Sequence, residues 1–181
     1  MTQIDPATTG VLSRQEIAAL LAAELPLVQH LPDPDAALQA NGIDLSVEEV
    51  ATFRGTGALT LDSANRRLPD TEPLAFDDDG LLTLPPGTYQ VRFTETINLP
   101  ADLMAYLRPR SSLLRSGVAL HTAVWDAGYQ GRGVALLVVY HAGGFTLQQF
   151  ARVGQLVFHR LAAATDATYA GTYQHEGLRP S

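Results

Sequence analysis

Apolar side chains near the start of the chain recur at helical spacing. Ser13 and Glu16 have the spacing of a capping box, in which the two side chains satisfy open backbone groups at a helix N-terminus. Apolar positions then recur at helical intervals over residues 17–25. The pattern therefore predicts a helix of about three turns that ends before Pro26, preceded by a leader over residues 1–12.

The rest of the chain has the pattern of short strands separated by prolines and glycines. Residues 88–97 alternate apolar and polar side chains, which predicts a half-buried strand with Thr94 and Thr96 on its polar face. Residues 134–140 are all apolar and predict a strand buried on both faces, and residues 153–161 predict a further strand. The pattern indicates an all-β fold, an antiparallel sandwich, barrel or jelly roll, with a short N-terminal helix.

Composition narrows the class of protein. The chain has 181 residues, of which 46% are hydrophobic, so one domain with a buried core is expected. The absence of cysteine excludes disulfides, thiol nucleophiles and cysteine-ligated zinc. No apolar run approaches the roughly 20 residues that cross a bilayer, and no signal-peptide pattern is found, so we expect a cytoplasmic protein that binds no membrane.

Charge is distributed unevenly along the chain. The net charge of −7 argues against non-specific nucleic-acid binding, which needs a surplus of positive charge. Residues 1–107 hold sixteen acids and five arginines, whereas residues 108–181 hold three acids and seven arginines. A basic second half in an acidic protein predicts a site for a small polyanion. The alternative is that these arginines pair with acids of the first half.

Residues 108–117 have the sequence RPRSSLLRSG, which combines groups suited to phosphate. Ser111 or Ser112 can cap a short helical turn with open amides, Arg110 adds a forked guanidinium, and Gly117 would end the turn. Taken alone, Arg-Ser-Ser is a common tripeptide and more often an ordinary helix start.

Residues 121–131, HTAVWDAGYQG, place one carboxylate between two aromatic side chains. Asp126 before Ala-Gly suits an ordinary turn. Close to a metal-bound polyphosphate, however, an aspartate can orient and deprotonate a water molecule.

Five motifs in order make the chain similar to the dUTPase and dCTP deaminase superfamily, most of all to its archaeal-type dUTPases. The motifs are NGIDL at 41–45, PRSSLLRSG at 109–117, TAVWDAGYQGRG at 122–133, ARVGQLVF at 151–158 and YAGTYQHEG at 169–177. The resemblance implies a distorted jelly-roll, barrel-like β domain over residues 13–168 and a nucleotide-covering tail over residues 169–181. It also implies a homotrimer whose active sites are shared between neighbouring subunits.

The resemblance assigns residues to nucleotide binding. The implied triphosphate ligands are Arg110, Ser111, Ser112 and Gln155. Residues 122–129, with Val124 among them, would bind the base through the backbone, and Tyr129 would pack on the sugar. The tail residues that would close over the nucleotide are Tyr169, Tyr173 and Gln174.

The resemblance also assigns residues to catalysis. Asp126 would act on the attacking water. Asp44 would support a Mg²⁺ ion through water, because the triphosphate itself supplies the direct ligands. Arg115 matches an arginine of the deaminases, and its role stays open between nucleotide contact and structural pairing.

One departure from the superfamily decides the expected reaction. Its deaminases carry a glutamate ten residues beyond the third-motif aspartate, where this chain has Leu136, and no acid lies between Asp126 and Asp166. Leucine cannot transfer the protons that deamination requires. The resemblance therefore implies hydrolysis of dUTP to dUMP and pyrophosphate, which removes dUTP and supplies dUMP. The alternatives are a dCTP deaminase or bifunctional enzyme, and a trimer that binds nucleotides without turnover.

Overall fold

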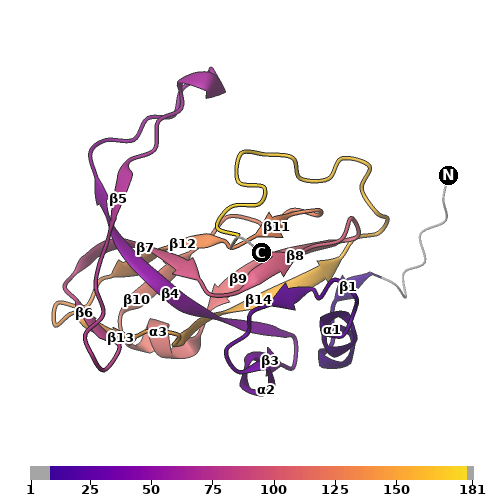
Figure 1. The fold of residues 1–181 in the computed structure, drawn as a ribbon, viewed down its shortest axis with the longest axis horizontal. Coiled ribbons are helices and arrows are strands. Elements are labelled where there is room, and N and C mark those ends of the chain that lie inside the picture. The colour runs from indigo at the N-terminus through magenta and orange to yellow at the C-terminus, as the bar shows by residue number, and fades with distance from the viewer. Residues whose placement is uncertain (1–8, 179–181) are drawn as a thin grey trace.

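A computed structural model describes residues 9–178 of the chain (Figure 1). Its strands are β1 (Gly10–Val11), β2 (Val28–Gln29), β3 (Leu38–Gln39), β4 (Gly42–Arg54), β5 (Asp70–Pro73), β6 (Leu81–Leu84), β7 (Gly87–Phe93), β8 (Thr96–Asn98), β9 (Leu103–Pro109), β10 (Val118–His121), β11 (Gln130–Gly131), β12 (Val134–Val139), β13 (Phe145–Gln148) and β14 (Arg152–Arg160). Its helices are α1 (Arg14–Leu21), α2 (Pro34–Ala37), α3 (Ser111–Arg115) and the 3-10 turn η2 (Ser63–Asn65). None of the described helices is long and apolar enough to span a membrane.

The strands form a curled antiparallel sheet, which confirms the predicted all-β, jelly-roll-like class. The main sheet runs β1-β14-β4-β7-β12-β10, with β9 added to β14 and with β3 and β5 added to β4. The long strand β4 pairs with β14 through its first half and with β7 through its second half, and a register shift lies between Val47 and Glu49. Such a bulge bends a strand, so β4 passes from one part of the sheet to the other (Figure 1).

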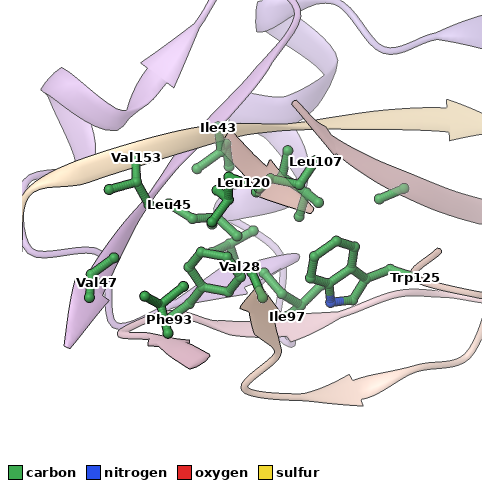
Figure 2. Close-up of a cluster of buried hydrophobic side chains, with 14 of the residues drawn as sticks. Val28, Ile43, Leu45, Val47, Phe93, Ile97, Leu107, Leu120, Trp125 and Val153 are labelled. Carbon is green, nitrogen blue, oxygen red and sulfur yellow. The ribbon is translucent and has the colours of Figure 1, made fainter. Parts of the chain in front are cut away.

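The core lies inside the curl of the sheet. Figure 2 shows part of it, with Phe93 and Trp125 among side chains from β4, β8, β9 and β10. The two rings lie 6.3 Å apart between centroids, and Trp125 is only 5% exposed. Trp125 therefore joins the segment 122–129 to the core and fixes the position of the residues beside it.

The predicted strand at 88–97 is divided into β7 and β8. Tyr89, Val91 and Phe93 are buried as predicted, but the chain bends between the two strands, at residues 94–95. The prediction that Thr94 and Thr96 face solvent is wrong, because both are buried. At the bend the hydroxyl oxygens of Thr94 and Ser46 lie 3.0 Å apart, within hydrogen-bond distance, so Ser46 takes the place of solvent beside Thr94.

The apolar run at 134–140 has one fully buried face. Along β12, residues 135, 137 and 139 are buried, whereas residues 134, 136 and 138 are half-buried. The prediction of burial on both faces is therefore wrong for a single chain. The strand predicted at 153–161 is confirmed as β14.

The N-terminal helix begins as predicted and ends early. Ser13 and Glu16 form the capping box, with the Glu16 carboxylate accepting from the Ser13 amide at 2.9 Å. Helix α1 ends at Leu21 because the chain turns back, and the Leu27 amide donates to the Leu20 carbonyl at 3.1 Å. The end of the predicted leader pairs with β14 as β1, while residues 1–8 lie outside the described residues.

Glu95 is one of the acids of residues 1–107, and the alternating pattern at 88–97 assigned it to neither face of the predicted strand. It is 1% exposed, and its carboxylate accepts hydrogen bonds from the Ser46 amide at 3.0 Å and the Ser46 hydroxyl at 2.6 Å. Burial outweighs these hydrogen bonds and raises the pKa of Glu95 from 4.5 to about 7. Glu95 is therefore largely neutral in the folded protein below neutral pH.

This pKa predicts a pH dependence of stability. Between about pH 4.5 and 7 the folded state binds more protons at Glu95 than the unfolded state, so its contribution to the free energy of unfolding falls as pH rises, by at most about 3 kcal/mol. We expect Glu95→Gln to remove this contribution. Urea unfolding of both proteins at pH 5 and pH 7.5 measures the difference. A stability difference that does not change with pH would contradict the raised pKa.

Candidate active site

A cavity of about 440 Å³ lies beside the segment 122–134 and beneath the tail, here the described residues 169–178. The predicted site residues that line it are Val124, Asp126, Tyr129, Tyr169 and Tyr173. Trp125 and Glu176 line it as well. We call this space the aromatic cavity. Its size and its aromatic walls suit a flat, partly polar ring.

Backbone hydrogen bonds fix the segment that carries Asp126. Trp125 exchanges two backbone hydrogen bonds with Ala105 of β9, at 2.9 and 3.1 Å. The Tyr129 amide donates to the Asp126 carbonyl at 3.1 Å, and Gly128 between them has a φ of +84°, which favours glycine. Asp126 itself is exposed, so its carboxylate can meet a ligand and a water molecule at the mouth of the aromatic cavity.

The tail is attached to this segment by polar contacts. Gln174 accepts from the Gln130 amide at 3.0 Å and donates to the Gly128 carbonyl at 2.9 Å. The Tyr169 amide donates to the Ala127 carbonyl at 2.8 Å. Gln174 thus holds the tail rather than lining the cavity, while the two predicted tail tyrosines face the cavity.

Tyr129 and Glu176 form a polar pair at the cavity wall. The Tyr129 hydroxyl donates to Glu176 Oε1 at 3.1 Å, and its ring meets Tyr169 edge-on at 5.7 Å. Burial, followed by the Glu176 carboxylate, raises the pKa of Tyr129, so the hydroxyl stays protonated. Burial also raises the pKa of Glu176, against the effects of the Tyr129 hydrogen bond and of Arg92.

A second group of predicted residues gathers around Asp44 on β4. Asp44 Oδ2 lies 3.3 Å from Arg110 Nε and 3.4 Å from Arg152 Nη1. The Asp44 side chain is 4% exposed, whereas the two arginine side chains are 37% and 32% exposed. Burial raises the pKa of Asp44, and the two guanidinium groups oppose that shift. Asp44 therefore orients two guanidinium groups whose outer N–H groups can bind an anion.

The other predicted phosphate ligands border this pair. Ser111 and Ser112 are the exposed first residues of α3, and Gln155 on β14 lies opposite Asp44 in the sheet. The helix differs from the prediction in its cap: Arg110 is the N-cap residue, and it makes no side-chain capping bond. We call these residues, with Asp44, Arg110 and Arg152, the arginine cradle.

Arg115 is exposed in the last turn of α3. Within residues 9–178, no ion pair with an acidic side chain involves it. The role of Arg115, either contact with the nucleotide or structural pairing, therefore stays open. Other arginines of the second half do pair with acids of the first half, which agrees with the alternative explanation of the uneven charge. They are Arg110, Arg132, Arg152 and Arg160.

The aromatic cavity and the arginine cradle lie at opposite ends of β9. Trp125 pairs with Ala105 near the start of the strand, whereas Arg110 follows its end. At about 3.3 Å per residue, the two positions are roughly 17 Å apart. The residues lining the cavity include none of the arginine cradle. Each chain thus presents two separate groups of predicted site residues.

Two residues of these groups, Arg152 and Glu176, carry no role in the sequence-based assignment. Both lie within the motifs that carry the resemblance. Arg152 is the single charged residue of ARVGQLVF, and Glu176 is the single acid of YAGTYQHEG. A charged residue in a segment of otherwise neutral residues is the signal that could have identified each of them.

The described residues do not form a metal cage of their own. Residues 9–178 contain no group of three or more histidine, aspartate or glutamate side chains placed to hold a metal ion. Asp44, the predicted support for Mg²⁺, directs Oδ2 toward two guanidinium groups. Its role near Mg²⁺ stays a prediction. The donor set fits only a metal ion that draws its inner ligands from a bound polyphosphate.

The curled antiparallel sheet that carries the aromatic cavity and the arginine cradle places the chain in the class of jelly-roll-like β proteins. A family model described as dCTP deaminase-like matches residues 11–161, so the chain belongs to the dCTP deaminase-like family. This agrees with the superfamily that the five motifs indicate.

Two curated relatives are similar over nearly their whole length. A protein of Methanosarcina mazei named probable deoxyuridine 5'-triphosphate nucleotidohydrolase is 44% identical over 167 residues, 92% of this chain and 98% of that protein. A protein of Archaeoglobus fulgidus with the same name is 40% identical over 169 residues, 93% of this chain and 98% of that protein. Among solved structures, the 2'-deoxycytidine 5'-triphosphate deaminase from Agrobacterium tumefaciens has a TM-score of 0.66 at 22% identity, covering 84% of this chain and 49% of that chain. This last likeness supports the fold.

Proposed function

We propose that the chain hydrolyses dUTP to dUMP and pyrophosphate. The observation that carries the proposal is the exposed carboxylate of Asp126 at the mouth of the aromatic cavity. The names of the relatives from M. mazei and A. fulgidus support the same substrate. Leu136 stands at the position of the deaminase glutamate. It supports hydrolysis over deamination because its side chain has no ionisable group that could transfer a proton.

The geometry suggests how each group would act. The base and deoxyribose would occupy the aromatic cavity, with the Tyr129 ring against the sugar. Asp126 would accept a proton from a water molecule as the water oxygen bonds to the α-phosphorus and the bond to pyrophosphate breaks. Arg110, oriented by Asp44, would hold the phosphates in line for this displacement.

We also propose that Mg²⁺ takes part, bound mainly through phosphate oxygens of the substrate. When bound, the ion would neutralise part of the phosphate charge. Asp44 supports this only indirectly, since its contacts in the chain are with Arg110 and Arg152. The net charge of −7 makes local cations necessary for binding dUTP.

We further propose a homotrimer in which each site joins the aromatic cavity of one subunit to the arginine cradle of its neighbour. The separation of roughly 17 Å along β9 supports this arrangement. The half-buried face of β12, with Val134, Leu136 and Val138, offers apolar surface that a neighbouring subunit can cover.

The test is an assay of dUTP and of each of the four standard deoxynucleoside triphosphates with Mg²⁺. Release of pyrophosphate and of ammonia is followed in parallel. We expect pyrophosphate from dUTP and no ammonia from dCTP, because Leu136 cannot protonate a leaving amine. Ammonia from dCTP would instead support a deaminase or a bifunctional enzyme. Tight dUTP binding without pyrophosphate release at any Mg²⁺ concentration would support a non-catalytic nucleotide-binding trimer.

A further inference from the structure

A hairpin arm, residues 55–69 between β4 and β5, extends away from the sheet on the side where the tail crosses (Figure 1). The backbones of Ala58 and Arg67 pair within the arm, at 2.7 and 2.9 Å. The side chains of Leu59 and Leu61 are almost fully exposed. The apolar side chains of the arm therefore do not pack against the sheet. This makes its contacts with the tail important for the position of both segments.

Arg66 joins the arm to the tail. Its Nη2 donates a hydrogen bond to Thr172 Oγ1 at 2.8 Å, across 106 positions of sequence. Its guanidinium carbon lies 5.5 Å from the centre of the Tyr173 ring, within the range of a cation–π contact. Tyr173 is one of the tail residues that line the aromatic cavity. One arginine thus contacts two successive residues of the tail segment that closes the cavity.

We propose that Arg66 is a positioning residue that latches the tail over the aromatic cavity and thereby strengthens nucleotide binding. Arg66 does not line the cavity, so it acts through Tyr173. This inference rests on the proposed function, because it concerns the same nucleotide site. It adds the arm, which none of the five motifs includes, to the parts of the chain that govern binding.

The size of the effect follows from the remaining attachments. Without Arg66, the tail keeps the hydrogen bonds of Gln174 and Tyr169, so it loosens but does not detach. Apparent affinity falls in proportion to the fraction of chains with the tail closed. An exposed hydrogen bond and cation–π contact of ordinary strength correspond to a rise in KM of about 5-fold. The chemical step, once the nucleotide has closed the tail, keeps its kcat within about twofold.

The experiment compares Arg66→Ala with Arg67→Ala, a matched control. Arg67 has the same charge one position away, and its Nε donates to the Thr56 carbonyl within the arm instead of contacting the tail. Hydrogen exchange without nucleotide should be faster at the amides of residues 169–176 in Arg66→Ala than in Arg67→Ala or the wild type. KM for dUTP should rise about 5-fold in Arg66→Ala alone.

Two further variants test the contact itself. Arg66→Lys keeps a donor and a cation and should restore most of the affinity. Thr172→Val removes the acceptor but leaves the contact with the Tyr173 ring, so it should add little to the KM change when combined with Arg66→Ala, compared with Arg66→Ala alone. Equal tail exchange and equal KM in Arg66→Ala and Arg67→Ala would overturn the latch. Faster exchange with an unchanged KM would overturn its effect on binding. If the wild type releases no pyrophosphate from dUTP, the proposed function fails, and the exchange measurement still decides whether the latch exists.

Discussion

Replacing Asp126 with asparagine is expected to lower kcat for dUTP by about 10²-fold or more and to leave KM close to the wild-type value. Asparagine has almost the same shape and can still orient a water molecule, but it cannot accept the proton that the water loses. The backbone contacts of Trp125 with Ala105 hold the segment in either protein, so the cavity should keep its form. The loss should therefore fall on the chemical step.

The measurement is steady-state release of pyrophosphate, together with dUTP affinity measured by calorimetry. Asp166→Asn is the matched control, because Asp166 is an exposed acid of the same half of the chain that does not line the aromatic cavity. It should turn over dUTP at the wild-type rate. An Asp126→Asn protein with an unchanged kcat would remove Asp126 from the mechanism.

The fold class could be predicted because alternation, turn residues and a capping box are local signals. The predictions were wrong where contacts between distant parts of the chain determine the course of the backbone and the burial of side chains. The bend at residues 94–95 exists because Ser46, far away in sequence, satisfies the polar groups of Thr94 and Glu95. The burial of Glu95 follows from the same contact. Nothing in the local pattern at 88–97 indicates that a strand from the first motif would meet it there.

The resemblance assigned site residues one by one but not their arrangement. Tyr129, Tyr169 and Tyr173 line one cavity, and their roles toward a nucleotide stay predictions. The pairing of Asp44 with Arg110 and Arg152 depends on the register between β4 and β14, which no single motif contains. The position of the arginine cradle at the far end of β9 likewise depends on three-dimensional structure. It raises the question of whether one chain, or two neighbouring chains of the proposed trimer, supply the two halves of the site.

Mixed trimers should answer that question with a large effect. Arg110→Ala removes a guanidinium from the arginine cradle, and Asp126→Asn removes the base from the aromatic cavity, so each variant alone should retain about 1% of wild-type activity or less. In a shared-site trimer assembled from equal amounts of both chains, a site is intact when an Asp126→Asn chain supplies the cradle and an Arg110→Ala chain supplies the cavity. About a quarter of the sites meet this condition, so co-refolding should raise activity to about 25% of the wild-type value.

The control is the same co-refolding with the Arg110→Ala/Asp126→Asn double variant in place of one partner. Within each mixed trimer, the double variant leaves every site without an intact cradle or an intact cavity, so activity should stay near that of the single variants. Native mass spectrometry should verify that mixed trimers are present in both samples. If they are present and activity does not rise in the first sample, the cavity and the cradle of one chain must act together, and the shared-site arrangement is wrong. Recovery to about a quarter would instead explain why one chain holds its two groups of site residues at opposite ends of a strand: each completes the site of a neighbour.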